Sequence, residues 1–283
     1  MKHFFNMNIT AADVNKLRQM TGAGMMDCKK ALQETENDVE KAIDYLRKKG
    51  QKVAGKRADR NANEGFVVAK TTEDKTFAAV VMVNCETDFV GKNEEFQQFA
   101  KSILDAGLAK RLTSVSDLMP LKIGAVTVEE KLNDLLGKTG EKIQVAHYEC
   151  IEAPVVFAYN HFGNRLATIL GMNKKDAKNV MEIGHELTMQ VAAMNPVAVD
   201  KDDVSKEVID REIEIGKDQA RQEGKPEEML EKIAMGKLNK FFKDSTLLNQ
   251  DFIKDTKKTV GQYISENDKD LKVTSFKRLQ LGA

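Results

Sequence analysis

The sequence has little material for covalent or metal-based chemistry. Its three cysteines, Cys28, Cys85 and Cys150, are odd in number, widely spaced and form no CxxC pair. A disulfide framework or a zinc site needs cysteines, or cysteines and histidines, in close and regular sets. We therefore expect a reducing compartment, no structural metal and no bound cofactor.

Charge of one sign and long apolar runs are also missing. The 44 basic and 44 acidic residues cancel, whereas a dedicated nucleic-acid-binding protein normally carries a basic excess. No apolar run approaches the roughly 18 residues needed to cross a bilayer. Residues 1–5 are too few and too weakly apolar for a secretion signal. These absences predict a cytoplasmic protein that binds neither nucleic acid directly nor membranes.

The motifs of two enzyme classes are absent as well. A P-loop GTPase needs a GxxxxGK[ST] segment to hold phosphates, and the chain contains none. A thiol enzyme needs a base beside its cysteine. His147 lies close before Cys150 in a β-like run, but the other histidines show no recognisable pairing with a cysteine. We therefore expect a protein that acts by binding and is not itself an enzyme.

The N-terminal part of the chain has the apolar period of three short helices. Thr10 is predicted to be the N-cap of the first helix, which is predicted to end in the glycine-containing break at residues 21–24. The third helix is predicted to stop at Gly50. Helices this short cannot bury their apolar faces alone, so residues 1–55 are predicted to form a bundle. The Lys/Arg-rich stretch 51–63 is predicted to be an exposed linker or a helical extension.

A β-rich pattern followed by a helical one then occurs twice. Residues 65–84 form two β-like runs around a polar turn, and an amphipathic helix follows. Residues 155–173 repeat strand, Gly-centred turn and strand, with a helix expected at about 177–194. We interpret the two regions, 56–145 and 146–283, as related α+β subdomains with small antiparallel sheets. A shared pattern without duplication is the alternative.

A charged segment in the second subdomain is predicted to form a helical hairpin at about 199–243. The break at Gly224-Lys225-Pro226 separates its two helical patterns. A helix near 260–265 and a β-like run at 273–279, which could return to the second sheet, follow. A projecting hairpin of this kind could also dimerise. The apolar residues assigned to its seam are Val204, Val208, Ile213, Ile215, Met229, Ile233, Leu238 and Phe241.

Two stretches resemble the signatures of a known family. Residues 21–32, Thr-Gly-Ala-Gly-Met-Met-Asp-Cys-Lys-Lys-Ala-Leu, strongly resemble the N-terminal signature of the elongation factor Ts family. Residues 83–92, Val-Asn-Cys-Glu-Thr-Asp-Phe-Val-Gly-Lys, are similar to its second signature, which contains Thr-Asp-Phe-Val. Their separation, the hairpin after Pro196 and the residues 258–262 fit as well. The resemblance therefore covers about 9–281.

The resemblance implies an α+β fold and an exchange function. The bundle would be ubiquitin-associated-like and would meet the GTPase domain of elongation factor Tu. The second subdomain would meet another domain of that partner, and the hairpin would be the family's coiled-coil module. The family binds elongation factor Tu in its GDP-bound and nucleotide-free forms, weakens Mg²⁺ and nucleotide binding, and promotes GDP release in protein biosynthesis. The alternative is a ubiquitin-associated-type adaptor, or another protein-interaction module, without exchange activity. An adaptor built on residues 8–50 alone would leave most of the chain unexplained.

The resemblance also associates Thr87, Asp88, Phe89 and Val90 with displacement of the partner's Mg²⁺. An aromatic side chain in such a loop could act as an interface anchor, because a few large residues supply most of the energy of an interface. Periodicity alone would instead make Phe89 and Val90 loop anchors tucked into the core. It would make Asp88 a turn or helix-start residue.

Four further residues are candidate partner contacts. Met25 and Met26 are adjacent helix positions that cannot both face inward, so at least one should be exposed, where a Met suits a partner surface. Lys29 is a solvated residue by default and a contact by resemblance. His161, in the turn of the second β-rich region, matches a family contact position only loosely. A plain turn histidine explains it equally well.

Overall fold

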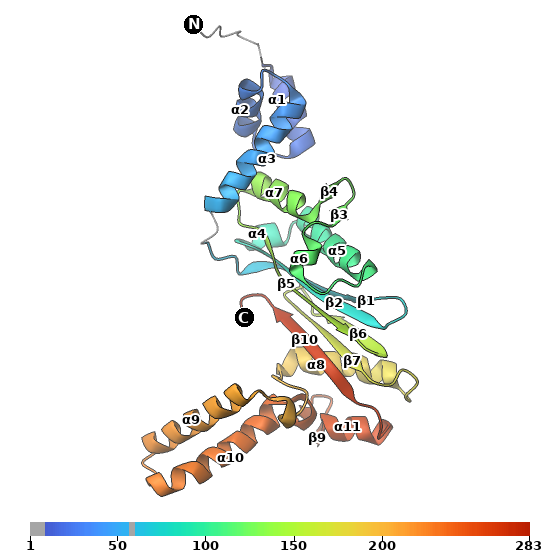
Figure 1. Ribbon diagram of the computed structural model, residues 1–283, viewed down its shortest axis with the longest axis vertical. Helices are drawn as coiled ribbons and strands as arrows, with labels where there is room; N and C mark the ends of the chain where they lie inside the picture. The colour runs from blue at the N-terminus through green and yellow to red at the C-terminus, as the bar shows by residue number, and fades with distance from the viewer. Residues whose placement is uncertain (1–8, 57–59) are drawn as a thin grey trace. The chain divides into compact units, whose positions relative to one another are not determined.

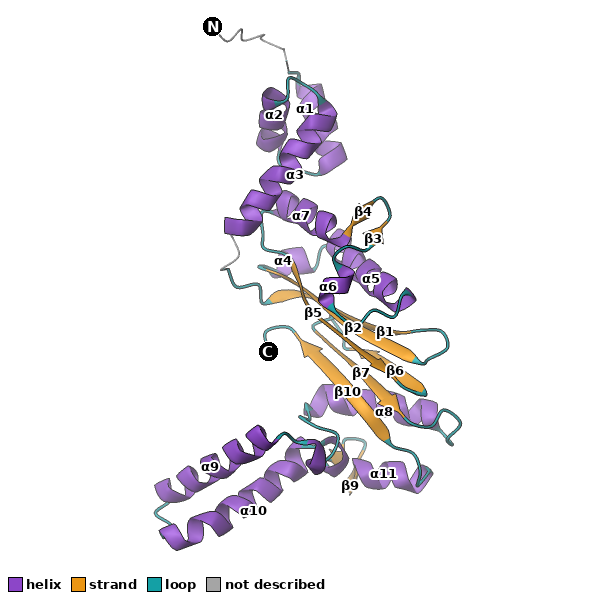
Figure 2. Cartoon of the chain, viewed as in Figure 1, coloured by secondary structure: helices purple, strands orange, loops and turns teal. Residues whose placement is uncertain are grey.

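The computed structural model describes residues 9–56 and 60–283 (Figure 1). Helices and small sheets are mixed along the chain (Figure 2), which confirms the predicted α+β class. Contacts within the chain define two units. Val81–Tyr148 and the described residues up to Val68 make up most of the first unit, and Ala69–Val80 with Glu149–Leu279 make up the second. Residues 1–8 of the predicted bundle domain and 57–59 of the predicted linker lie outside the described residues.

Three helices open the first unit, as predicted. They are α1 (Ala11–Thr21), α2 (Met25–Glu34) and α3 (Val39–Lys56). Thr10 caps α1 through a reciprocal pair of bonds, in which the Asp13 amide donates to the Thr10 hydroxyl at 3.2 Å and the Thr10 amide donates to Asp13 Oδ2 at 3.0 Å. Gly22, in the left-handed region at φ 68°, ends α1. The buried residues of the bundle core are Val14, Leu17, Ala23, Cys28, Ala31, Leu32 and Ala42.

The predicted end of the third helix at Gly50 is wrong, because the helix continues to Lys56. A glycine inside a helix costs about 1 kcal/mol relative to alanine, which lowers helix stability without ending the helix. The residues that follow Gly50 are mostly lysine, glutamine and alanine, which favour helix. Of the two alternatives for this stretch, the helical extension holds for residues 51–56.

The rest of the first unit consists of helices and strands arranged around the sheet whose middle strand is β2. They are β1 (Glu64–Thr71), β2 (Phe77–Cys85), α4 (Asp88–Gly91), α5 (Glu94–Ala109), α6 (Val115–Leu118), β3 (Lys122–Ile123), β4 (Val126–Thr127), α7 (Val128–Thr139) and β5 (Gln144–Glu152). Strands β1, β2 and β5 form one sheet in the order β1-β2-β5, and each of the three strands has residues in both units. The predicted hairpin and amphipathic helix are both confirmed.

Helix α7 packs against α3 and was not predicted from the sequence. It begins with a capping box, in which the Thr127 hydroxyl accepts from the Glu130 amide at 3.1 Å. The Glu130 carboxylate accepts from the Thr127 amide at 2.7 Å. The pattern Thr-x-x-Glu before an apolar run is a sequence-level helix start, so this signal was available.

The second unit is built on a three-stranded sheet in the order β10-β7-β6. Its elements are β6 (Val155–Asn160), β7 (Leu166–Met172), α8 (Val180–Met194), α9 (Lys206–Gln222), α10 (Glu227–Ser245), β8 (Asp251–Phe252), β9 (Asp255–Thr259), α11 (Val260–Asn267) and β10 (Val273–Gln280), with 3₁₀ turns at Lys201–Asp203 and Leu247–Asn249. Strands β6 and β7 pair antiparallel, with Val155 opposite Met172. The predicted return of the last strand to this sheet is confirmed.

Helix α8 packs on β6 and β7 and closes the core of the second unit. Ile183 and Leu187 of α8 and Leu170 of β7 are fully buried there. Between them the helix approaches the sheet closely, because a Cβ on Gly184 would lie 2.3 Å from ring atoms of Phe157. The helix begins at Val180 rather than Ala177, after a residue in the left-handed region.

The helical hairpin consists of α9 and α10, but its predicted seam is partly wrong. Ile215 and Met229 are 41% and 45% exposed. The helices instead meet at small residues, and a Cβ on Gly216 would lie 3.1 Å from the Cα of Ala234. Small side chains let two helix backbones approach closely, and a search for large apolar residues misses such a seam. The buried residues of the two helices are Gly216, Ala220, Leu230, Ala234 and Leu238.

No helix in the described part of the chain is long and apolar enough to span a membrane. All three cysteines are free thiols, and Cys28 and Cys85 are buried, as expected of small apolar residues.

A glycine substitution in α8, compared with a matched control in α10, tests the packing of α8. Gly184→Ala should lower the free energy of unfolding by about 1–3 kcal/mol, because the added methyl group overlaps the buried ring of Phe157. Gly236→Ala is the matched control in α10, where a Cβ meets no atom within 4 Å. It should stabilise the protein by about 0.5–1 kcal/mol through helix propensity alone. Denaturant unfolding measures both, and a neutral Gly184→Ala would contradict the described contact.

Candidate functional site

The Thr-Asp-Phe-Val residues form a single helical turn between β2 and α5. The chain leaves β2 at Cys85, and α4 begins one residue after Thr87, which is extended at φ −123° and ψ 156°. Asn93 then caps α5 by accepting a hydrogen bond from the Phe96 amide at 3.3 Å. We call residues 86–92 the β2–α4 turn. A four-residue helix is too short to be stable by itself, so its conformation depends on contacts with the rest of the first unit.

Phe89 projects from this turn into solvent. Its exposed fraction is 83%, whereas Val90 is half-buried. The interpretation of Phe89 as a core anchor is therefore wrong. Burying a Phe side chain stabilises a fold by about 1.5–3 kcal/mol, and this turn forgoes that stabilisation. An exposed aromatic side chain of this kind is available to a partner surface.

Asp88 begins α4 and carries a negative charge beside Phe89. Lys92 Nζ donates to its Oδ2 at 2.6 Å, one helical turn later. This hydrogen bond holds the pKa of the Asp88 carboxyl below its usual range. Asp88 is therefore ionised at neutral pH, and its charge is offset by a solvated lysine that is itself 76% exposed. Because an exposed ion pair contributes little free energy, Asp88 can leave Lys92 for a charged group of a partner at a small cost in stability.

The N-terminal end of the β2–α4 turn is held by the segment that follows α7. Glu141 Oε2 accepts from the Thr87 amide at 3.0 Å, and Oε1 accepts from the Thr87 hydroxyl at 2.7 Å. One position earlier, Glu86 accepts from the Lys142 amide at 2.7 Å and from Arg60 Nη1 at 3.1 Å. The adjacent residues Glu86 and Thr87 are thus hydrogen-bonded to the adjacent residues Lys142 and Glu141.

The C-terminal end of the turn is held by close backbone packing. Gly91 is buried, and a Cβ there would lie 3.0 Å from the Gly65 carbonyl oxygen. Gly65 has φ 147°, and a Cβ on it would lie 2.1 Å from the Val83 carbonyl oxygen. Gln97 Nε2 also donates to the Gly91 carbonyl at 3.2 Å. Both glycines are therefore needed for the approach of β1, β2 and α4.

Cys85 lies beneath the turn as an unreactive thiol. Its Sγ donates to the Thr87 carbonyl oxygen at 3.1 Å. Burial, followed by the nearby charge of Glu141, raises the pKa of the thiol to about 12. Burial also raises the pKa of Cys28 and of Cys150. Because thiolate is the reactive form of cysteine, these thiols are poor nucleophiles at neutral pH.

The second group of candidate residues lies on α2. Met25 and Met26 are 54% and 75% exposed, so both are on the surface, whereas the sequence required this of only one. Lys29 is exposed as well. The opposite face of α2 holds Cys28 and Leu32 in the bundle core. The exposed face of α2 is therefore apolar at its N-terminal end and basic one turn later.

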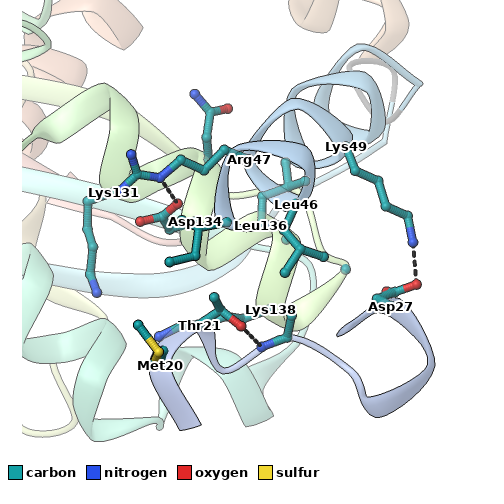
Figure 3. A pocket seen from close by; sticks show the side chains of 15 residues that line it. Met20, Thr21, Asp27, Leu46, Arg47, Lys49, Lys131, Asp134, Leu136 and Lys138 are labelled. Atoms are coloured by element: carbon teal, nitrogen blue, oxygen red, sulfur yellow. Dashed lines mark hydrogen bonds and ion pairs between the residues drawn. The ribbon is translucent and has the colours of Figure 1, made fainter. Parts of the chain in front are cut away.

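A cavity of about 460 Å³ lies between the bundle and α7 (Figure 3). Arg47 Nε lies 3.7 Å from Asp134 Oδ1, and Lys49 forms an ion pair with Asp27. Burial raises the pKa of Asp134, although the positive charge of Arg47 opposes the shift. Leu46 contributes to the apolar lining. These charged groups pair with one another, so the cavity has the character of a partly filled packing gap. It was missed because α7 was not predicted.

The third candidate, His161, lies in the β6–β7 turn of the second unit. Its Nδ1 is 2.9 Å from the Tyr159 hydroxyl. The next residue, Phe162, is 97% exposed and was not singled out from the sequence. Its signal was an aromatic residue directly before Gly163 and Asn164, which are both in the left-handed region.

The candidate residues thus occupy three separate elements: α2, the β2–α4 turn and the β6–β7 turn. Among the residues that the structure describes, no group of three or more His, Cys, Asp or Glu side chains could hold a metal ion. What these elements share is apolar side chains in solvent beside charged or polar ones. This arrangement suits protein binding rather than chemistry at a bound ligand.

Comparison with known proteins gives consistent matches along the chain. The family model described as elongation factor TS matches residues 86–283. The elongation factor Ts of Amoebophilus asiaticus (strain 5a2) is 50% identical over 277 residues, which cover 98% of this chain and 100% of the relative. That of Christiangramia forsetii is 48% identical over 274 residues, 97% of this chain and 99% of the relative. That of Porphyromonas gingivalis is 44% identical over 278 residues, which cover 98% of this chain and 100% of the relative. This chain therefore belongs to the elongation factor Ts family, as its two signature stretches predict.

Proposed function

We propose that this chain is a guanine-nucleotide exchange factor for elongation factor Tu and that the β2–α4 turn acts on the partner's Mg²⁺ and phosphate site. The observation that supports this role is Phe89, 83% exposed on a turn that is held at both ends. Because the turn is held at both ends, its backbone would lose little conformational freedom when Phe89 enters a partner.

Exchange requires that the factor bind the nucleotide-free partner more tightly than the GDP-bound partner. By linkage, the nucleotide then weakens the factor by the same ratio as the factor weakens the nucleotide. A side chain that fits only when the partner's nucleotide site is distorted supplies this difference. Phe89 is the residue of the turn with the size and exposure for that role.

Asp88 adds a charge to the same turn. Mg²⁺ requires near-octahedral oxygen coordination and bridges nucleotide phosphates. The Asp88 carboxylate, brought near this coordination shell, would compete for the ion or displace a ligand, and Phe89 would separate the surrounding elements. Thr87 and Val90 flank Asp88 and Phe89 in the turn. Loss of Mg²⁺ then weakens GDP binding.

We assign docking roles to the other parts of the chain. The bundle, residues 1–55, would bind the partner's GTPase domain through Met25, Met26 and Lys29. Residues 56–145 would present the β2–α4 turn. Residues 146–283 would bind another domain of the partner, with His161 as one contact. These roles are supported by the exposure of both methionines and by the position of His161 in a surface turn.

The decisive experiment measures release of mant-GDP from purified elongation factor Tu with and without this protein. Phe89→Ala should lower the second-order rate constant of stimulated release about thirtyfold, the equivalent of an anchor worth about 2 kcal/mol. Its melting temperature should stay within about 2 °C of the wild type, since an exposed side chain contributes little to the fold. The rate constant of the Phe89→Leu variant should lie between those of the wild type and of Phe89→Ala. Lost thermal stability with unchanged exchange would mean that Phe89 serves the fold.

Met26→Ser tests the bundle. It should raise the concentration of factor that gives half-maximal release by about fivefold and leave the maximal rate unchanged, because a docking contact is made in both nucleotide states. Lys30→Ser is the matched control on the same helix, where the lysine is also exposed. Equal effects of the two substitutions, or a change confined to the maximal rate, would contradict a docking role for the methionine.

Replacement of the hairpin tests where the activity lies. A Gly/Ser linker of about six residues in place of 206–240 should leave the rest of the chain folded, since packed antiparallel helices end about 8–10 Å apart. Val204 and Leu247, which are buried, remain in place. Exchange should fall less than in Phe89→Ala. Abolished nucleotide release with native-like circular dichroism and melting would make the hairpin a primary contact.

A further inference from the structure

We propose that Glu141 is a positioning residue for nucleotide exchange, which acts by holding the β2–α4 turn so that Phe89 stays presented to the partner. The proposal rests on the proposed function of that turn. Glu141 lies 54 residues from Thr87 in the sequence, beyond the end of α7.

Both oxygens of the Glu141 carboxylate are bonded to Thr87. Oε2 accepts from the backbone amide at 3.0 Å, and Oε1 accepts from the side-chain hydroxyl at 2.7 Å. The Thr87 side chain makes no capping bond to α4, so the residue before Asp88 is held from outside the turn. Hydrogen bonds to an ionised acceptor are stronger than those between neutral groups.

Glu141 is itself held in a defined position. Gly140 ends α7 in the left-handed region at φ 70°. The Thr139 hydroxyl then accepts from the Glu141 amide at 3.1 Å. The amide of Lys142 donates to the Glu86 carboxylate at 2.7 Å. The carboxylate of Glu141 therefore belongs to a reciprocal pair of side chain-to-backbone bonds between two segments.

This clamp matters because it fixes both the backbone amide and the side chain of the residue directly before Asp88. An 83% exposed Phe side chain would gain stability by folding back onto the protein. The close packing of Gly91 on Gly65 holds only the far end. Without Glu141, Thr87 and Asp88 would sample more conformations, and each binding event would have to order them again. Ordering is slow or unfavourable when the competent conformation is a minor population.

The first test compares Glu141→Ala with Glu141→Gln, Thr87→Val and the control Glu129→Ala, an exposed glutamate at the start of α7. Glu141→Ala should reduce the second-order rate constant of stimulated mant-GDP release about tenfold. Glu141→Gln and Thr87→Val each keep part of the contact and should lose less. Glu129→Ala should match the wild type. Wild-type exchange in Glu141→Ala would overturn the proposal.

Hydrogen exchange reports the positioning directly, without the partner. The Gly91, Lys92 and Asn93 amides donate to carbonyls of residues 87, 88 and 90, so their protection should fall at least fivefold in Glu141→Ala or, if that variant does not fold, in Glu141→Gln. Protection in β2 should not change. Unchanged protection at these three amides would overturn the proposal.

A double-mutant cycle separates positioning from a general effect on the fold. In the Phe89→Ala background, Glu141→Ala should cause little further loss of exchange, because the residue that it positions is already gone. If the losses of exchange rate in the two single variants multiply in the double variant, Glu141 acts independently of Phe89. That outcome would refute the positioning role of Glu141. If the wild type does not stimulate GDP release, the exchange function fails. Hydrogen exchange still decides whether Glu141 orders the turn.

Discussion

The packing of one helix on a narrow sheet is the constraint on which the second unit depends. A three-stranded sheet has too little apolar area to be stable unless another element covers its face. Helix α8 provides that cover for β6 and β7, and it approaches so closely that only a glycine, Gly184, fits beside the ring of Phe157. The same core takes up residues of α11 and β10, including Ile264 and Val273. The C-terminal elements therefore share the core on which α8 is packed.

The first unit shows how a fold can keep an apolar side chain in solvent. Burial of Phe89 would be favourable, so the turn must be denied the conformations that would allow it. Two different kinds of contact do this. Gly91 packs its backbone against Gly65, and Glu141 bonds to Thr87 through both carboxylate oxygens. The first is steric, whereas the second consists of two hydrogen bonds to one carboxylate.

The helical hairpin combines a highly charged surface with a seam of small residues. Lys217 lies 3.1 Å from Glu214 on its own helix and 3.0 Å from Glu231 on the facing helix. Exposed ion pairs of this kind contribute at most about 1 kcal/mol each. The close approach of Gly216 to Ala234 brings the two helix backbones near each other, where many dispersion contacts add up. The small residues at the seam therefore hold the two helices together.

Local signals in the sequence were enough to locate most of the secondary structure. The Thr10 cap and the Gly22 end define α1, and the apolar period of α5 and the β6–β7 pattern follow from burying one face of each element. The glycine stop signal failed at Gly50, where the helix continues to Lys56, because one unfavourable residue does not outweigh its neighbours. Strands β3 and β4, of two residues each, are too short to show any period.

By itself the sequence determined the fold class and, through its two signature stretches, the family. It also marked Phe89 as a candidate, although periodicity favoured a buried side chain. Only the tertiary structure decided that Phe89 is exposed and that Glu141 holds Thr87. The reason is physical: a period in the sequence reports which face of one element is buried. A bond between residues that lie 54 positions apart leaves no such trace.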